Sequence, residues 1–113
     1  MDLSHLRLEG VDFTGACLSR ADLTGARLTG TLQAANLQHL QAPGVNLSGC
    51  DLSGCDLTAA NLAGADISRS RLEGATLTST FLQRANLRGT SLVNARLART
   101  RLAWAKLEEH NLS

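Results

Sequence analysis

The chain has 113 residues, with eleven basic and ten acidic side chains that leave a net charge of +1. A chain of this length makes one small domain, and the balanced charge excludes a uniformly acidic or uniformly basic surface. Hydrophobic residues make up 43% of the chain and aromatic residues only 3%, a composition too apolar for a disordered segment. Long apolar runs are absent, so the sequence predicts neither a membrane span nor a signal peptide, and we expect no membrane partner.

Leucine dominates the chain and recurs at every fifth residue. The spacing of five runs from Leu3 to Leu28, and resumes from Leu32 to Leu112. Of these 23 central positions, 20 are leucine, and the others are Phe13, Ala42 and Ile67. A period of five fits neither an α-helix with 3.6 residues per turn nor a flat alternating strand.

The residues around each centre follow the same period. A small residue stands two positions before most centres, all six aspartates stand one position before, and all ten glycines stand two positions after. Small residues fit beside the inward leucines, and glycine tolerates the positive φ of a tight corner. Asp and Asn hydrogen-bond to nearby backbone in turns, so we interpret the aspartates as structural and not as a metal or acid–base site.

Three units show the repeat most clearly: Ala21–Gly25, Ala60–Gly64 and Ala85–Gly89. They resemble the motif A-(D/N)-L-x-x of the pentapeptide-repeat family, and the resemblance covers residues 1–113 as a single domain. It implies an all-β fold, a right-handed quadrilateral parallel β-helix in which four pentapeptides form one coil of twenty residues. The chain would then make between five and six coils. The expected structural core includes Ala21, Leu23, Leu52, Ala60, Leu62, Leu72, Ala85 and Leu87.

The repeat is irregular in three places. One residue is missing near 29–32, where Gly30 follows one centre by two positions and precedes the next by two. In the unit at 40–44, Leu40 and Ala42 exchange their usual places beside Pro43, which predicts either a swap that preserves core volume or a short loop. Residues 102–113 stay in phase but contain helix formers, so they form either a further coil or a capping helix. Neither end is clearly capped, and end-to-end self-association is therefore possible.

No pattern in the sequence indicates catalysis or a cofactor. The histidines His5, His39 and His110 have no partners at the spacing of metal ligands, and no catalytic or nucleotide-binding motif occurs. The cysteines are an odd set of three, Cys17, Cys50 and Cys55, which predicts reduced thiols in a cytoplasmic protein. We therefore expect a protein that is not an enzyme, with no catalytic, metal or cofactor site.

Charge is distributed unevenly along the chain. Residues 1–66 hold seven acids and three bases, whereas residues 69–106 hold eight bases and one acid. If residues twenty apart stack, Phe81 lies beside Arg101 and Arg84 lies beside Trp104. The two outward aromatic residues then share one basic face near the C-terminal end, where Arg and Trp are typical of protein-binding hot spots. The predicted partner site is Phe81, Arg84, Arg99, Arg101 and Trp104, unless each arginine only covers an aromatic ring.

Three functions fit these patterns to different degrees. The preferred function is a non-enzymatic scaffold for protein–protein interaction, with a partner that the sequence does not identify. The family resemblance suggests a mimic of duplex DNA that modulates DNA gyrase, but the basic residues 69–106 argue against it. Nucleic-acid binding by that basic segment is a further alternative, although no recognition motif supports it.

Overall fold

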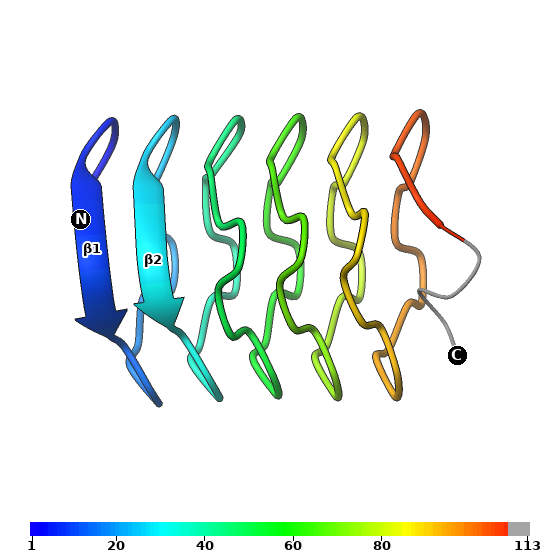
Figure 1. The fold of residues 1–113 in the computed structure, drawn as a ribbon, viewed down its shortest axis with the longest axis horizontal. Coiled ribbons are helices and arrows are strands. Elements are labelled where there is room, and N and C mark those ends of the chain that lie inside the picture. The colour runs from blue at the N-terminus through cyan, green and yellow to red at the C-terminus, as the bar shows by residue number, and fades with distance from the viewer. Residues whose placement is uncertain (109–113) are drawn as a thin grey trace.

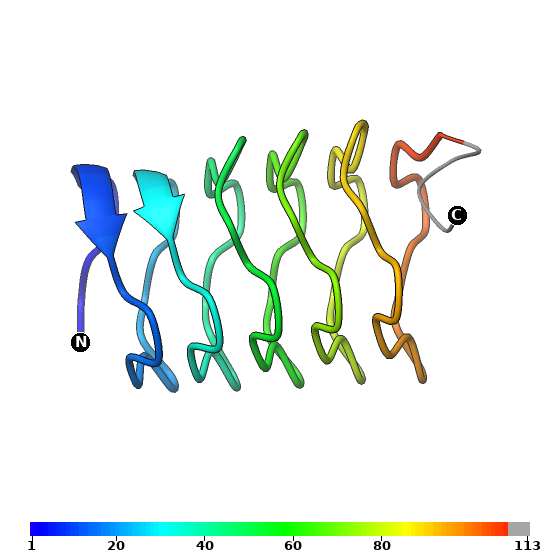
Figure 2. The same ribbon diagram turned by 60° about the horizontal axis from the view of Figure 1, so that its bottom comes forward.

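The structure is a computed structural model that describes residues 1–108, and that part of the chain contains no helix. Its two strands, β1 (Arg7–Asp12) and β2 (Arg27–Thr31), lie side by side and parallel. From β2 onward the chain continues as coils stacked along one axis, away from the N-terminus (Figures 1 and 2). These coils confirm the expected all-β fold, and no described helix is long and apolar enough to cross a membrane.

Backbone pairing joins successive coils at an interval of twenty residues, or of nineteen across the phase slip. Asn61 forms a parallel bridge with Phe81, and Phe81 forms one with Arg101, twenty residues further on. The Leu62 N–H donates to the Phe81 carbonyl oxygen at 2.8 Å, and the Phe81 N–H donates to Ala60 at 2.9 Å. Within residues 1–108 these pairs form four stacks, which begin at Asp2, Arg7, Asp12 and Cys17.

A turn follows each central residue. After Leu23, the Ala26 N–H donates to the Leu23 carbonyl oxygen at 3.0 Å, and Gly25 has a φ of 65°. Every described residue two positions after a centre has a positive φ, which includes ten glycines and eleven other residues. A positive φ at the third residue is typical of a type II turn, and glycine adopts it without strain. The corner role expected for glycine is confirmed, whereas the eleven other residues occupy it at an energetic cost.

The side chains just before the centres stabilise these turns. Asp51 Oδ1 accepts the Ser53 N–H at 3.0 Å, and Asn61 Oδ1 accepts the Ala63 N–H at 3.1 Å. The same contact recurs at Asp2, Asp12, Asp22, Asn36, Asn46, Asp56, Asp66 and Asn86. The aspartates are therefore turn residues, and no group of metal-ligating side chains occurs among the described residues.

The interior is filled by the centres and by the small residues two positions before them. The eight expected core residues are each at most 1% exposed: Ala21, Leu23, Leu52, Ala60, Leu62, Leu72, Ala85 and Leu87. Three threonines in the small-residue column, Thr80, Thr90 and Thr100, hydrogen-bond across to the preceding coil. Thr80 Oγ1 donates to the Leu57 carbonyl oxygen at 2.7 Å, and Thr100 Oγ1 donates to Leu77 at 2.6 Å. Buried hydroxyl groups are thus satisfied by backbone.

At the phase slip, the two strands change register. Leu8 pairs with Leu28, but Val11 pairs with Gly30, so β1 carries one residue more than β2 between these pairs. The Gly10 N–H, displaced from the ladder, donates to Thr29 Oγ1 at 2.8 Å. This is a β-bulge, and it takes up the missing residue.

The irregular unit at 40–44 lies within the coil stack. Leu40 and Ala42 are both fully buried, and the Ala42 N–H donates to the Asn61 carbonyl oxygen at 2.8 Å. Pro43 occupies the second turn position, where proline is favoured and where the N–H of other units bonds only to a side chain. Pro43 therefore removes no bond between coils.

At the other end, coil geometry extends beyond residue 102. Lys106 bridges Asn86, and the Ala105 N–H closes a turn onto the Leu102 carbonyl oxygen at 2.9 Å. His110 and Leu112 lie outside the described residues.

Gly30 tests the bulge, with Gly54 as a matched control. A Cβ at Gly30 would lie 2.1 Å from the Val11 carbonyl oxygen, whereas one at Gly54 would meet nothing within 4 Å. Gly54→Ala should lower the free energy of unfolding by about 1–2 kcal/mol, the cost of a left-handed backbone. Gly30→Ala should lower it by about 3 kcal/mol or more, because the backbone must also shift. Urea denaturation followed by circular dichroism measures both, and equal losses would contradict the bulged pairing of β1 with β2.

The turn aspartates predict a loss of stability in acid. Hydrogen bonds from Ser53 lower the pKa of Asp51; desolvation raises the pKa of Asp56, but hydrogen bonds from Thr58 and Gln38 outweigh it and leave that pKa lowered. A lowered pKa in the folded state stabilises the protein above the unfolded value of about 3.9, and this stabilisation disappears as the pH falls through the folded pKa. The urea midpoint should therefore drop steeply below about pH 4.

Asn, which other units carry at the same position, supplies the control. Asp51→Asn with Asp56→Asn keeps an oxygen acceptor for the turn but removes the titrating group. This variant should show a smaller fall of the urea midpoint in acid than the wild type. An identical pH profile would show that these carboxylates do not contribute.

Candidate functional site

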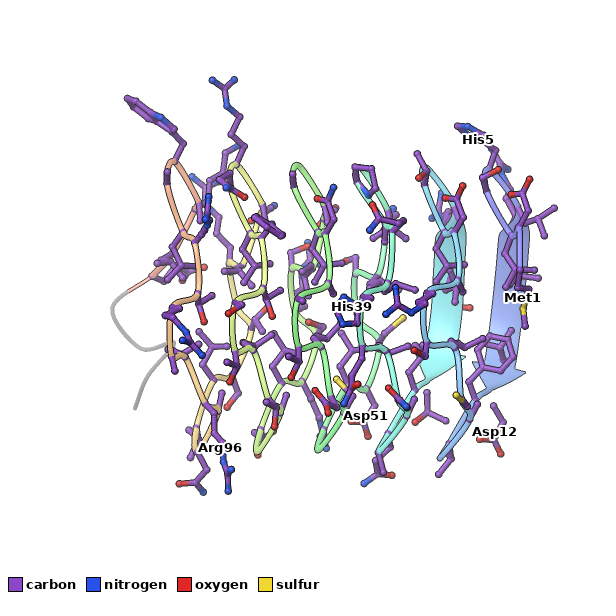
Figure 3. The ribbon with its side chains drawn as sticks, turned by 180° about the vertical axis from the view of Figure 1, so that it is seen from behind. Met1, His5, Asp12, His39, Asp51 and Arg96 are labelled. Carbon is purple, nitrogen blue, oxygen red and sulfur yellow. The ribbon has the colours of Figure 1, made fainter. Side chains whose placement is uncertain are left out.

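The site is built on one stack of bridged residues, which we call the Asp2–Arg101 face. Its bridged positions are Asp2, Asp22, Gln41, Asn61, Phe81 and Arg101. The adjoining turns add Ser4, His5, Thr24, Gly25, Pro43, Gly44, Ala63, Gly64, Gln83, Arg84, Ala103 and Trp104. Figure 3 shows His5 projecting from the outer edge of this face in the first coil.

Phe81 and Arg101 are in direct contact. The Arg101 guanidinium carbon lies 5.0 Å from the centroid of the Phe81 ring, within the range of a cation–π interaction. Their backbones form a bridge, so the interval of twenty residues sets this contact. The five N–H groups of a guanidinium allow Arg101 to bind an acidic group while it remains on the ring.

Arg84 and Trp104 occupy successive corners of the same face. The Arg84 N–H donates to the Ala103 carbonyl oxygen at 2.9 Å, which places Trp104 one coil beyond Arg84. Both residues have a φ of 63°. Trp104 is 82% exposed, and no cation covers its ring among residues 1–108. Tryptophan is enriched in protein interfaces, where its large ring is buried.

Arg99 stands apart from the other four predicted site residues. It is exposed and has a φ of 56°. It lies in the turn that comes just before Arg101 in the chain. The structure thus joins Phe81 to Arg101 by contact and places Arg84 and Trp104 along one edge. Arg99 lies on the opposite edge of the face.

A shallow hollow beside Phe81 was not predicted from the sequence. It has a volume of about 640 Å³ and is lined by Asn61, Ala63, Gly64, Phe81, Gln83 and Arg84. Gln83 Oε1 is buried there without a hydrogen-bond partner. Phe81 is large, whereas Ala63 and Gly64, about one coil earlier, are small, so the surface has a step between them. A large residue that follows small ones at this interval is the sequence signal that could have predicted the hollow.

Among residues 1–108, the histidines and cysteines lie at separate places in the coils. His5 and His39 are exposed, and both lie at corners with positive φ. Cys50 and Cys55 are buried, and this burial raises the pKa of Cys50 to about 11 and that of Cys55 to about 12. Cys17 is the exposed cysteine.

Comparison with known proteins gives a consistent result. The family model of pentapeptide repeats matches in eight copies, over residues 1–30, 31–69, 43–78 and 80–113. A pentapeptide repeat protein from the cyanobacterium Cyanothece 51142 superposes with a TM-score of 0.69 at 24% identity, over 98% of this chain and 86% of its own. No curated protein matches the sequence.

Two further solved structures are similar. A pentapeptide repeat protein from Nostoc PCC 7120 is 40% identical with a TM-score of 0.68, over 69% of this chain. This chain spans only 64% of that protein. QnrB1, a plasmid-mediated fluoroquinolone resistance protein, is 12% identical with a TM-score of 0.53, over 99% of this chain and 85% of its own, so its likeness concerns the fold alone. The fold is that of the right-handed β-helices.

The reactivity of the thiols tests the burial of Cys50 and Cys55, which lie in the small-residue column. In native protein, a disulfide reagent at neutral pH should modify Cys17 rapidly and leave Cys50 and Cys55 unmodified, because thiolates are the reactive species and both buried thiols have raised pKa values. In denaturant all three should react. Cys17→Ser should abolish the rapid reaction, and rapid labelling that persists in this variant would contradict the structure.

Proposed function

This chain belongs to the pentapeptide-repeat family, and we propose that it is a non-catalytic scaffold that binds a protein partner through the Asp2–Arg101 face. The proposed contact residues are Phe81, Arg84, Arg99, Arg101 and Trp104. We also propose that residues 1–113 belong to a single domain; the three free cysteines support a cytoplasmic location.

We propose a four-sided coil for the body of this scaffold. Four bridge stacks in the described chain, the pairing interval of twenty residues and a turn every five residues support it. Between five and six coils then fit the chain. A rod with flat sides presents its outward residues in straight columns, which suits the recognition of an extended surface on a partner.

The observation that carries the proposal is the exposure of Trp104. Its indole is 82% exposed at a corner where glycine would be less strained, and Arg84 stands one coil away along the same edge. Trp and Arg are among the residues enriched in binding hot spots. The hollow beside Phe81 adds a concave surface next to these two side chains.

Charge argues against the two alternatives. A mimic of duplex DNA needs a negative surface along the rod, but residues 69–106 carry eight bases and one acid. DNA gyrase is therefore a weaker candidate partner. Nucleic-acid binding would use a continuous basic stripe, whereas the Asp2–Arg101 face carries Asp2 and Asp22 at its other end.

The test is affinity capture with a matched pair of variants. The site variant carries Arg84→Ala, Arg101→Ala and Trp104→Ala and should retain the fold. It should capture at least about tenfold less partner than the wild type, because its hot-spot side chains are removed. The control variant Arg88→Ala and Arg96→Ala removes the same charge from other faces and should capture as much as the wild type; Arg96 is labelled in Figure 3. Equal capture by wild type and site variant would refute the proposed site. Weak, salt-insensitive retention on heparin would separately exclude nucleic-acid binding.

A further inference from the structure

The Asp2–Arg101 face changes its chemistry from one end to the other. Its first coils carry Asp2 and Asp22, and its last coils carry Arg84 and Arg101. The middle of the face is uncharged and holds mostly small or short residues: Gln41, Pro43, Gly44, Asn61, Ala63 and Gly64. Acidic and basic ends on one flat face are complementary to the same face turned end for end.

We infer that this face binds a second copy of the chain, with the two rods antiparallel about a two-fold axis between the Gln41 and Asn61 levels. The inference rests on the proposed function, because it uses the same face and names its partner. A two-fold interface presents the same patch on both subunits, so each contact occurs twice.

The symmetry fixes which residues meet along the bridged stack. Because the axis lies across the rods, each bridged position meets the position at the same distance from the other end. Arg101 then meets Asp2 of the second copy, and Phe81 meets Asp22, so the Arg101 guanidinium on its ring gains an acidic neighbour. Gln41 meets Asn61, two amides that can hydrogen-bond. Opposite charges thus meet without a like-charge contact in this stack.

The same operation also pairs the turn residues. Arg84 meets Gly25, and Trp104 meets His5, which the first coil projects outward at the matching edge (Figure 3). Gln83 meets Thr24, whose side chain is shorter. The hollow beside Phe81 faces the neighbouring Pro43 and Thr24 levels. Gln83 therefore meets a shorter residue, whereas Trp104 and Arg84 meet the corner where the His5 imidazole lies over Gly25.

The same operation fails on each of the other three stacks. In the stack that begins at Arg7, it brings Arg7 against Lys106. In the stack that begins at Asp12, it brings Asp51 against itself, and in the stack that begins at Cys17 it brings Asp56 against itself. Like charges opposed in an interface suppress association. Among the described residues, the Asp2–Arg101 face alone is self-complementary.

The face is also large enough for a stable dimer. The rod measures 34 × 23 × 21 Å, so a long face offers about 700 Å² to a partner, near the roughly 800 Å² per subunit of a standard interface. The interface would bury Trp104, the most exposed large hydrophobic residue of the described chain.

Sedimentation of the full chain with charge variants tests the association. At about 100 μM, a concentration above the micromolar dissociation constants of weak interfaces of this size, the wild type should sediment as a dimer. High salt should weaken this association, because it screens the charge pairs. Arg101→Glu should be monomeric, since it places an acid opposite Asp2. Arg96→Glu makes the same change in the equivalent column of another face and should remain dimeric. Adding Asp2→Lys to Arg101→Glu should restore the dimer.

Disulfide trapping tests the antiparallel geometry in a Cys17→Ser background. A chain with both Thr24→Cys and Gln83→Cys should form a covalent dimer under mild oxidation, because each new thiol meets its complement on the second copy. Positions 24 and 83 are too far apart along the rod to bridge within one chain. Each single variant should stay monomeric on denaturing gels, as should the control pair Gln33→Cys and Glu73→Cys on another face.

The outcomes separate the two proposals. A monomeric wild type, cross-linking of either single variant through parallel rods, or growth beyond a dimer through end-to-end contacts would each overturn the antiparallel dimer. If such a monomer still captures another protein that the Arg84, Arg101 and Trp104 variant loses, the proposed function stands and only the dimer fails. If the dimer forms as described and that triple variant captures every other protein unchanged, the face serves self-association alone and the hetero-partner is excluded.

Discussion

The structure depends on the backbone hydrogen bonds that join each coil to the next. Phe81, for example, donates to Ala60 and accepts from Leu62, and equivalent pairs recur along the described chain. Since these bonds lock each unit over the unit one coil earlier, side chains of the same column lie in straight stacks. The repeat therefore determines both the narrow apolar interior and the order of chemical groups along each outer face.

The turns between sides impose the second constraint, and it bears on the candidate site. Each corner needs a positive φ, which ten glycines supply without strain. Arg84, Arg99 and Trp104 adopt the same positive φ at an energetic cost, whereas glycine occupies the equivalent corner in other units. The coil bonds hold these large side chains outward, so the scaffold provides orientation without dedicated supporting contacts. Ala34, Ala59 and Ser79 adopt the same backbone, so this strain is a property of the fold.

A face built in this way has direction, because successive coils need not carry the same charge. The Asp2–Arg101 face runs from acidic to basic while its backbone geometry stays constant. Flat surfaces with periodic backbone have little shape specificity of their own. If such a face binds a partner, its specificity comes from the order of its outward groups, because like charges that oppose each other exclude a pairing and opposite charges favour it.

The sequence by itself determined the five-residue unit, the inward columns, the glycine corners and the contact of Phe81 with Arg101, because all of these follow from one period. The tertiary structure alone decided the hollow beside Phe81, the unpartnered Gln83 Oε1 and the bond from Thr80 to the Leu57 carbonyl oxygen. It also decided that the 40–44 unit stays within the coil stack. These features depend on the volumes and carbonyl positions of residues in adjacent coils, which a period in the sequence does not specify.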